Sequence, residues 1–259
     1  MRDTSARREK IISLLKEKGS VQVHDLSKLF NISSVSIRKD LKFLDQRGIA
    51  TRVYGGAFLN TMNGETTETS VAIKQKKNVN KKCNLALAAT RLIKTGDSII
   101  LDSGTTNSQI ALLLKNIDNI TAITNDLNII DIIARFDETE LIVLGGKLRR
   151  KSMFFHGNQA EKTLKDLHAD KLFLGVDGFH MEKGITTHFE SEATLNATMC
   201  NAVTEVIVVT DSSKFDKICL HKICDISNIT TLITDSGMTN TYREGLISLG
   251  IEVIVVDKN

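Results

Sequence analysis

Apolar residues recur at helical spacing in three short segments near the start of the chain. The first two segments cover residues 5–18 and 24–30, and each places apolar side chains on one face. The third begins after Ser33 or Ser34, either of which could cap its first turn. Its predicted inward positions are Ile37, Leu41 and Leu44. Because segments this short are not stable alone, and a tight Asn-Ile-Ser turn separates the last two, the spacing predicts a helix-turn-helix.

β-branched and aromatic residues surround a pair of glycines directly after Gly48, in the stretch IATRVYGGAFL. This pattern predicts a two-stranded hairpin that turns at the Gly-Gly pair. Three helices followed by such a hairpin form a winged helix-turn-helix, which we expect to occupy residues 1–60.

The outward face of the third helix is basic and also carries a valine. A helix in the major groove of DNA needs cations for phosphates, hydroxyls for phosphates or base edges, and in places an apolar contact to a thymine methyl. Val35 suits that apolar contact; alternatively, it packs on a neighbour and the cations form a solvated face. We expect Asp40 to form a structural ion pair with an arginine or to cap a helix. The residues predicted to contact DNA are Ser33, Ser34, Val35, Ser36, Arg38, Lys39, Lys42, Arg52, Tyr54 and Gly55.

Apolar strand-like runs alternate with helical patterns from residue 83 onward. The runs are SIILD, ITAIT, LIVLGG, KLFLGVD, EVIVVT, TTLIT and EVIVV, and the helical patterns include residues 106–116, 126–136 and 190–202. This alternation predicts an α/β domain with a parallel sheet that is covered on both faces. The carboxyl ends of such strands open into one crevice, and several of these strands end in polar or small residues, so we expect a ligand site there.

The residue types at these strand ends suit a small phosphorylated polyol. Residues 103–106, Ser-Gly-Thr-Thr, lie where a strand turns into a helix, so their backbone N–H groups and hydroxyls could hold an anion. Lys214 could add a positive charge. Asp102, Asn125 and Asp177 suit sugar hydroxyls or amides better, because carboxylates repel phosphate.

Charge is distributed unevenly along the chain. The net charge is +6 for residues 1–60, +3 for residues 61–82 and −6 for residues 83–259, which together give +3. A small basic unit is therefore fused to a larger acidic one, and the basic unit suggests a polyanionic partner such as double-stranded DNA. Residues 61–82 have little apolar periodicity and many Asn, Thr and Lys, so we expect a linker there.

The spacing of the cysteines and the hydropathy of the chain bear on metal binding and on the location of the protein. The four cysteines, Cys83, Cys200, Cys219 and Cys224, are scattered without a Cys-x-x-Cys pair, so we expect reduced thiols and no metal site. We also expect no cofactor. No apolar run is long enough for a membrane span and the N-terminal residues lack the apolar stretch of a signal peptide, so the expected location is the cytoplasm.

Several motifs together resemble one family over nearly the whole chain. The stretch SVSIRKDLKFLDQRGIATRVYGGAFL, with its Ile-Arg-Lys-Asp-Leu and Tyr-Gly-Gly-Ala motifs, resembles the DeoR family of bacterial sugar-responsive repressors. Within that family, TSARREKII, GSVQVHDLS, LDSGTT, ADKLFLGVDG, EKGITTH and VVTDSSKF are similar to regulators of N-acetylgalactosamine utilisation. The resemblance implies a larger domain of the ribose-phosphate isomerase or glucosamine-phosphate deaminase type.

The resemblance also implies a set of effector-binding residues at the strand ends. Lys214 would hold phosphate, and Glu192 would approach the sugar unless it is an ordinary surface glutamate. The full set is Asp102, Ser103, Gly104, Thr105, Thr106, Thr124, Asn125, Gly145, Gly146, Gly175, Asp177, Gly178, Thr186, Thr187, Glu192 and Lys214. The implied effector is a phosphorylated amino sugar or a tagatose phosphate, with a hexitol phosphate as the alternative.

Three functions compete for this arrangement. A transcriptional repressor that senses a sugar phosphate explains the basic unit, the linker and the acidic unit together, and we expect it to act as a dimer or tetramer. A sugar-phosphate isomerase or deaminase would explain only the acidic unit, and the six histidines show no obvious catalytic pairing, so we predict no enzyme and no catalytic residues. A DNA-binding architectural protein would leave the polar strand ends unexplained.

Overall fold

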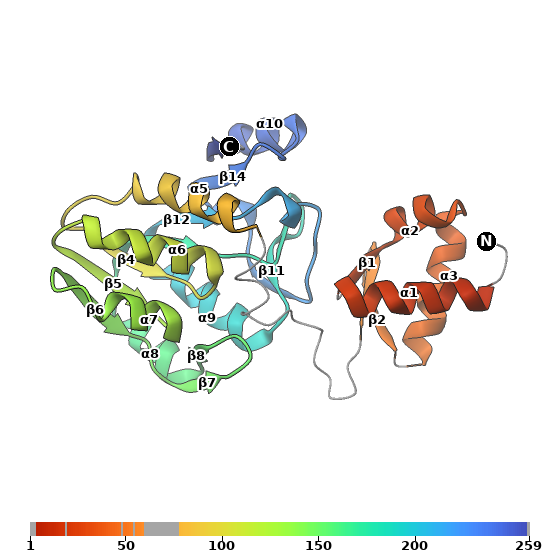
Figure 1. Cartoon of the computed structure of the whole chain (residues 1–259), viewed down its shortest axis with the longest axis horizontal. Helices are drawn as coiled ribbons and strands as arrows, with labels where there is room; N and C mark the ends of the chain where they lie inside the picture. The colour runs from red at the N-terminus through yellow and green to blue at the C-terminus, as the bar shows by residue number, and fades with distance from the viewer. Residues whose placement is uncertain (1–3, 19, 48, 54, 60–77, 258–259) are drawn as a thin grey trace. The chain divides into compact units, whose positions relative to one another are not determined.

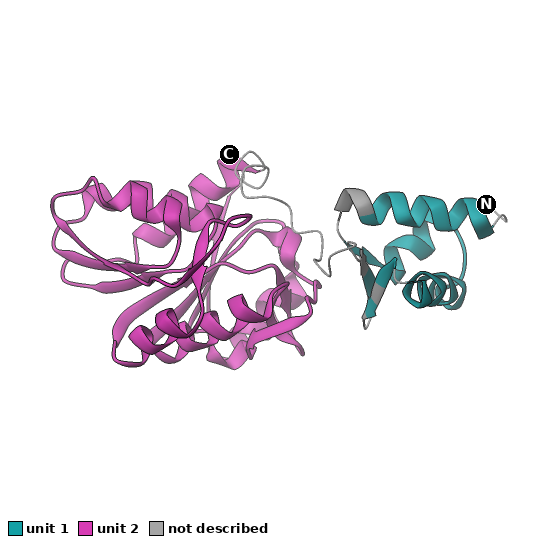
Figure 2. Ribbon diagram, turned by 90° about the horizontal axis from the view of Figure 1, so that it is seen from below, with its two compact units in different colours: residues 1–69 teal, residues 70–259 magenta. Residues whose placement is uncertain are grey.

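The chain folds into two compact units, residues 1–69 and residues 70–259 (Figure 1, Figure 2). The computed structural model describes residues 4–18, 20–47, 49–53, 55–59 and 78–257. The first unit has one apolar core and the second has two, one on each face of its large sheet.

The first unit is a winged helix-turn-helix, as the sequence predicts. Three helices pack around a core that contains Ile11, Leu15, Leu26 and Ile37, and a three-stranded antiparallel sheet in the order β1-β3-β2 closes it. The short first strand was not predicted. The elements are α1 (Thr4–Lys18), β1 (Ser20–Gln22), α2 (Val23–Phe30), α3 (Ser34–Gln46), β2 (Ala50–Val53) and β3 (Gly56–Leu59).

The second unit is built on a seven-stranded parallel sheet, which confirms the predicted α/β fold. All seven predicted apolar runs form its strands. In spatial order they are β15 (Glu252–Val256), β14 (Thr231–Asp235), β12 (Val203–Val209), β9 (Ala169–Leu174), β4 (Ser98–Leu101), β5 (Ile120–Thr124) and β6 (Thr139–Val143). From β4 the chain adds β5 and then β6 toward one end of the sheet. It then returns to β9, the neighbour of β4 on the opposite side, and adds β12, β14 and β15 in that direction. The direction of winding therefore changes between β4 and β9.

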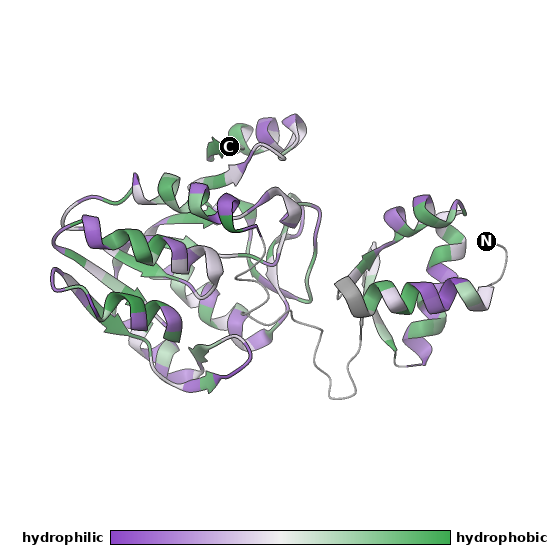
Figure 3. Cartoon of the chain, viewed as in Figure 1, coloured by the Kyte–Doolittle hydropathy of each residue, from purple (hydrophilic) through white to green (hydrophobic). Residues whose placement is uncertain are grey.

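Helices cover both faces of this sheet (Figure 2). Ile99 and Leu101 of β4 face one apolar core, whereas Ile100 between them faces the other, as expected for a strand that is buried on both sides. The strands are correspondingly apolar along their length (Figure 3). The first core is covered by α5 (Val79–Thr90), α6 (Thr105–Leu113) and α7 (Leu127–Ile133), and the second by α8 (Asn158–Lys165), α9 (Glu190–Asn201) and α10 (Asn240–Ser248).

Smaller elements lie outside the central sheet and the six helices that cover it. They are the antiparallel hairpin of β7 (Lys147–Arg149) and β8 (Phe154–His156), an antiparallel sheet of β10 (Gly178–His180), β11 (Gly184–Thr187) and β13 (His221–Cys224), and the 3₁₀ turns η1 (Leu114–Asn116), η2 (Ser212–Lys214) and η3 (Ile226–Asn228). No helix in the described part of the chain is both long enough and apolar enough to span a membrane.

The linker is shorter at its C-terminal end than the sequence suggested. Residues 79–82, expected to belong to a linker over residues 61–82, form the first turn of α5. Lys82 is 8% exposed, and the Lys81 ammonium pairs with the carboxylate of Asp235 at the end of β14. Polar composition hid this turn because its Lys81 pairs with the end of β14, while the apolar residues of α5 come later. Residues 60–77 lie outside the described residues.

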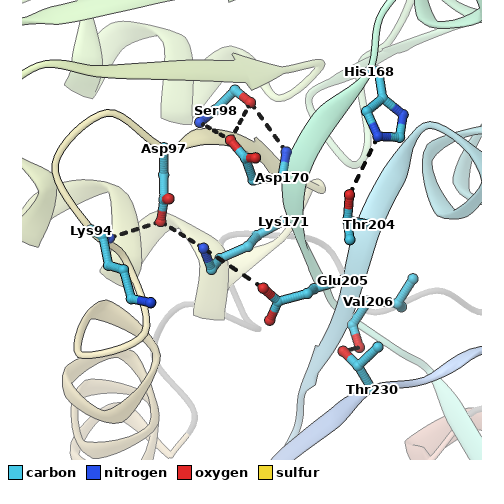
Figure 4. Close-up of polar contacts among 10 residues, drawn as sticks. All are labelled: Lys94, Asp97, Ser98, His168, Asp170, Lys171, Thr204, Glu205, Val206 and Thr230. Carbon is cyan, nitrogen blue, oxygen red and sulfur yellow. Dashed lines mark hydrogen bonds and ion pairs between the residues drawn. The ribbon is translucent and has the colours of Figure 1, made fainter.

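Polar bonds join the strands at the amino edge of the sheet (Figure 4). The ammonium of Lys171 on β9 lies 2.7 Å from Asp97, which precedes β4, and 3.9 Å from Glu205 on β12. Ser98 and Asp170 also bond across β4 and β9. These contacts fix the three central strands at the edge opposite the predicted crevice.

Candidate functional site

The outer face of α3 presents the side chains that the sequence assigned to DNA. Ser33 caps the helix, because its hydroxyl accepts a hydrogen bond from the Ser36 backbone N–H at 3.3 Å. Val35 is 56% exposed, so more than half of its surface is available for a contact outside the unit. The basic residues on this face, Arg38, Lys39 and Lys42, are exposed, and Ser34 and Ser36 are partly exposed.

An ion-pair cluster behind this face holds α3 against α1. Asp40 is 1% exposed, and its two carboxylate oxygens accept hydrogen bonds from Arg7 Nε at 2.7 Å and Arg8 Nε at 2.8 Å. The Arg8 guanidinium also stacks 3.8 Å from the ring centre of Phe43 on α3. The predicted structural ion pair of Asp40 is therefore confirmed, with two arginines instead of one.

The wing, which is the hairpin of β2 and β3, is bonded to the end of α3. The backbone N–H of Arg52, whose side chain is exposed, donates to Asp45 Oδ1 at 3.3 Å. The predicted turn at the Gly-Gly pair is wrong by one residue: Gly55, with φ of +87°, lies in the turn, whereas Gly56 is already in β3. A side chain at Gly56 would collide with the carbonyl of Val21 in β1, which explains why glycine is needed there. Tyr54 lies outside the described residues.

Asp102 lies at the centre of the carboxyl edge of the large sheet. It follows β4 and is 1% exposed, and its side chain accepts hydrogen bonds from the N–H groups of Ser103 at 2.6 Å and Gly175 at 3.2 Å. It thus joins the loops after β4 and β9, where the direction of winding changes. Burial raises the pKa of the Asp102 carboxyl well above its ordinary value, and the nearby carboxylates of Glu192 and Asp126 raise it further.

The start of α6 is a tight loop that a second carboxylate holds. Gly104 has φ of +128°, a conformation that L side chains rarely adopt. Its N–H donates to Asp126 Oδ2 at 3.0 Å, while Asp126 Oδ1 accepts the N–H groups of Asn128 and Ile129 and so caps α7. In this loop Thr105 is buried, whereas Ser103 and Thr106 are partly exposed. Burial raises the pKa of Asp126 as well.

The next two predicted positions are Thr124, the last residue of β5, and Asn125, which follows it, and both are buried. The Thr124 hydroxyl donates to the Leu101 carbonyl at 2.8 Å, which is a bond between neighbouring strands. Asn125 donates its amide N–H to the Phe155 carbonyl at 2.9 Å, and its carbonyl oxygen has no hydrogen-bond partner among the described residues. Asn125 therefore retains an acceptor for a ligand, whereas Thr124 is structural.

Gly145 and Gly146 connect β6 to the β7–β8 hairpin, which lies against the end of β5. Gly146 has φ of +132°, and a Cβ at this position would collide with the carbonyl of His156. A Cβ at Gly145 would meet open space. The close approach of the Gly146 backbone to that of His156 therefore explains why glycine is needed at this position, without any ligand.

Lys214 of η2 and Asp177, in the loop after β9, form an ion pair. The Lys214 ammonium lies 3.2 Å from Asp177 Oδ1, and the Thr187 hydroxyl donates to Asp177 Oδ2 at 3.3 Å. The side chains of Lys214 and Asp177 are 26% and 12% exposed. Since Asp177 follows Gly175 by two residues, one loop connects this ion pair to Asp102. The carboxyl edge of the sheet thus carries a cation, Lys214, paired with a carboxylate in the same loop that bonds to Asp102.

The remaining predicted positions have mainly structural contacts. The Thr186 hydroxyl accepts the N–H of Cys219 at 2.9 Å, and a Cβ at Gly178 would collide with that same hydroxyl and with the carbonyl of Lys217. Gly175 packs close to the carbonyl of Ser103. These residues shape the loops around the crevice.

Helix α9 brings Glu192 to the crevice. The side chain is partly exposed, and its charge acts on the buried Asp102, so it is more than a surface glutamate. One turn later on the same helix, Asn196 is 1% exposed, and neither polar atom of its amide has a hydrogen-bond partner among the described residues. A buried primary amide without partners costs free energy unless it bonds to water or a ligand.

Three residues important to the crevice were not predicted: Asp126, Asn107 and Asn196. The Asn107 amide donates to the carbonyls of Asp102 and Phe173, both at 2.9 Å, and so joins the ends of β4 and β9. Asp126 directly follows Asn125, and its position before a helical pattern is the signal that could have identified it as a cap. Asn107 and Asn196 lie within helices, and their sequence positions alone do not distinguish them from ordinary helical asparagines.

Comparisons with known proteins agree with this division of the chain. Residues 7–63 match a family model described as a DeoR-like helix-turn-helix domain, and residues 77–236 match one described as a DeoR C-terminal sensor domain. The chain is 47% identical over 253 residues to the "Putative aga operon transcriptional repressor" of Escherichia coli O157:H7, covering 98% of this chain and 94% of that protein.

More distant similarities extend over the same regions. The chain is 29% identical over 249 residues to the "HTH-type transcriptional repressor GlcR" of Bacillus subtilis, covering 96% of this chain and 95% of that protein. Among solved structures, a ribose 5-phosphate isomerase from Methanocaldococcus jannaschii gives a TM-score of 0.39 at 18% identity, over 54% of this chain and 55% of that one. With matched DNA-binding and sensor domains and a close relative over nearly its whole length, this chain belongs to the DeoR family of transcriptional regulators.

Proposed function

We propose that this protein is a repressor of a carbohydrate utilisation operon and that a phosphorylated sugar releases it from its operator. The observation that carries the effector half of the proposal is the Lys214–Asp177 ion pair, which lies on the same loop system as the buried Asp102. A cation beside hydrogen-bonding carboxyl and amide groups can bind one molecule with a phosphate at one end and hydroxyls at the other.

The DNA half of the proposal rests on the outer face of α3. Exposed Arg38, Lys39 and Lys42 would contact phosphates or base edges, and Val35 would contact a thymine methyl. Arg52 and Gly55 of the wing, together with Tyr54, would contact the adjacent backbone. The unit is fixed as a rigid body by Asp40 and its two arginines, so this face is preorganised for a groove.

In this proposal the effector acts by changing the bonds of Asp177. A phosphate that binds Lys214 competes with Asp177 for the same ammonium group, and Asp177 also bonds to Thr187 on β11. Binding thus rearranges the loops after β9 and β12 together. If the larger unit also forms the dimer or tetramer, this rearrangement changes the spacing of paired DNA-binding units and lowers operator affinity.

For the identity of the effector, we propose a phosphorylated amino sugar or a tagatose phosphate. The 47% identity to a protein named for the aga operon supports this class. A hexitol phosphate is the alternative. We further propose that the crevice binds without catalysing a reaction, because Asp102 is engaged by two backbone N–H groups and Asp177 by a lysine and a threonine.

Fluorescence anisotropy on DNA from upstream of the neighbouring carbohydrate genes tests this proposal. A hexosamine phosphate or a tagatose phosphate should release the full-length protein from this DNA, whereas the same sugars without phosphate should not. Release by the hexitol phosphate alone would favour the alternative effector. Binding to all DNA with equal affinity, or equal release by phosphorylated and unphosphorylated sugars, would contradict the proposal.

A further inference from the structure

The first turn of α5 is bonded to the end of β14 by an ion pair. The ammonium of Lys81 lies against Asp235 Oδ2, and Asp235 is the last residue of β14. Asp235 is 1% exposed, whereas the Lys81 side chain is 32% exposed. Farther along the helix, Leu85 and Ala89 pack into the apolar core on that face of the sheet. The start of α5 therefore has its own polar contact with the sheet, separate from the apolar contacts of its later turns.

The second oxygen of the same carboxylate holds the turn that carries Lys214. The Ser212 backbone N–H donates to Asp235 Oδ1 at 3.0 Å, and Ser212 and Lys214 are the two ends of η2. A Cβ at Gly237, two residues after Asp235, would lie 2.2 Å from Ser212 Oγ, so η2 and the turn after β14 are in close contact. A shift of η2 must therefore displace Asp235 or break its bond to Ser212.

The other end of η2 holds the cation of the crevice. Lys214 places its ammonium 3.2 Å from Asp177 Oδ1, in the loop after β9. Because Asp235 is buried, water does not readily replace a partner that either of its carboxylate oxygens loses. The contacts thus form a continuous series from Asp177 through Lys214, Ser212 and Asp235 to Lys81.

We propose that the Lys81–Asp235 ion pair couples the occupancy of Lys214 to the first turn of α5. The inference rests on the proposed function, in which a phosphate competes with Asp177 for the Lys214 ammonium. As Lys214 turns toward the phosphate, η2 shifts, Asp235 moves with Ser212, and the ion pair with Lys81 weakens. Since α5 is the first helix that the structure describes after the DNA-binding unit, its first turn is where this change reaches the chain that leads to that unit.

Lys81 is a positioning residue in this account, because it acts through Asp235 and not by contact with the effector. A purely structural ion pair would stabilise the larger unit to the same extent with and without effector. The two roles differ in the ratio of operator affinities measured without and with saturating sugar phosphate, since a structural ion pair leaves this ratio unchanged.

Fluorescence anisotropy of the full-length protein measures this ratio, with galactosamine 6-phosphate, tagatose 6-phosphate and sorbitol 6-phosphate as the probes. In the wild type we expect a ratio of about tenfold or more, within the usual range for coupled sites. Lys81→Met should lower the ratio to about twofold or less. Its affinity for the sugar phosphate, measured by calorimetry, and its operator binding without sugar phosphate should stay at the wild-type level. Lys81→Arg, which keeps the charge, should keep the wild-type ratio.

Hydrogen–deuterium exchange of the same proteins reports on the turn itself. The Lys82 backbone N–H donates to the Asn78 carbonyl at 3.1 Å in the first turn of α5. In the wild type, the sugar phosphate should speed exchange in peptides that contain this turn, because its polar contact with β14 weakens. In Lys81→Met the turn should already exchange rapidly, and the sugar phosphate should not change its rate.

Asp235→Asn and Lys222→Met complete the set of variants. Asp235→Asn keeps an acceptor for the Ser212 N–H but removes the charge that pairs with Lys81, so it should reduce the ratio as Lys81→Met does. Lys222→Met removes an ion pair with Asp225 from the surface of the same unit and should keep the wild-type ratio.

The possible failures of the proposed function and of the coupling are distinct. The coupling alone is overturned if Lys81→Met keeps the wild-type ratio, or if it binds the sugar phosphate so weakly that lost binding explains the lost release. If none of the three probes releases the wild-type protein from its operator, the proposed function fails and the coupling fails with it.

Discussion

Ser98 and Asp170 bind each other in both directions across the amino edge of the large sheet. The backbone N–H and the hydroxyl of Ser98 both donate to Asp170 Oδ2, at 2.8 Å and 2.7 Å, and the backbone N–H of Asp170 donates back to the Ser98 hydroxyl oxygen at 3.1 Å (Figure 4). These bonds align β4 with β9, the strands between which the winding changes direction. The geometry of the crevice at the far end of the same strands depends on this alignment.

We expect Asp170→Ala to destabilise the larger unit by about 1 kcal/mol, the usual contribution of such hydrogen bonds near solvent. The two Ser98 hydrogen bonds hold the pKa of Asp170 below its ordinary value. A lowered folded-state pKa means that the carboxylate stabilises the fold above about pH 4 and that this contribution disappears as the pH falls further. Urea unfolding at pH 7 and pH 3.5 should therefore show a larger difference between wild type and variant at pH 7.

The matched control for this prediction is Asp118→Ala, because Asp118 is also an exposed aspartate in the larger unit. It should change the free energy of unfolding by less than about 0.5 kcal/mol at either pH. A loss of stability in Asp170→Ala that grew as the pH fell would show that the carboxylate is not the stabilising form.

In the DNA-binding unit, Asp40→Ala should cost about 3 kcal/mol or more of stability. The substitution leaves two arginines without their buried partner, and such unpaired charges are more costly than the loss of an exposed ion pair. Differential scanning calorimetry of the full chain should show an earlier transition for the first unit alone. Arg8→Ala should destabilise the unit less than Arg7→Ala does, because the Arg8 side chain is 25% exposed whereas that of Arg7 is 9% exposed. Equal melting of Asp40→Ala and wild type would contradict this account.

The large-scale fold was predictable because its strands are buried on both faces. A run such as residues 98–101, Ser-Ile-Ile-Leu, is apolar at consecutive positions only where both sides of a strand are covered, so the parallel sheet follows from the sequence. Short strands such as β1 and β7 have too few residues to show an alternation of apolar and polar positions. They form because tertiary neighbours supply their partners.

The candidate site was predictable only in part, and for a related reason. Strand ends can be located from the sequence, so the positions of Asp102, Asn125 and Asp177 after β4, β5 and β9 could be predicted. The Asp126–Gly104 and Lys214–Asp177 bonds join residues from different loops, and their existence depends on strand order, which the sequence pattern does not specify. The sequence likewise could not show that Thr124 and Thr186 use their hydroxyls within the fold.

Arg38→Ala and Lys39→Ala should each weaken operator binding while changing the free energy of unfolding by less than about 0.5 kcal/mol, as expected for exposed side chains. Anisotropy titrations at several salt concentrations measure the first effect and urea unfolding the second. Lys162→Ala on α8 removes an equally exposed cation from the other unit and should leave DNA affinity unchanged. If both α3 variants bound the operator as wild type does, α3 would not be the recognition helix.

Val35→Ala should lose preference at a single base position, with the slope of log affinity against log salt unchanged. A methyl contact to thymine discriminates between bases but neutralises no phosphate. Competition with operators that differ at one base pair provides the measurement. Leu29→Ala on α2, which removes a similarly exposed apolar side chain, should not alter the preference. A uniform loss of affinity for all sequences in Val35→Ala would indicate a packing role.

Lys214→Met tests the proposed phosphate contact. The substitution keeps most of the apolar stem and removes the charge, so affinity for the sugar phosphate should fall by about 1.5 to 3 kcal/mol, the range for a charge-assisted hydrogen bond. Asp177 keeps its bond from Thr187, and both members of the ion pair are partly exposed, so stability should fall by only about 1 kcal/mol. Operator binding without effector should remain at the wild-type level.

Isothermal titration calorimetry with the phosphorylated and unphosphorylated sugar measures this contribution. Lys222→Met is the matched control, because Lys222 forms an ion pair with Asp225 at the surface and has no role in the proposed crevice. The control should bind the sugar phosphate as wild type does. In Lys214→Met the difference in affinity between the phosphorylated and unphosphorylated sugar should shrink, because the removed ammonium is the group proposed to bind the phosphate. Should that difference persist unchanged, the phosphate would lie elsewhere, and the competition between phosphate and Asp177 for Lys214 could not be the step that releases DNA.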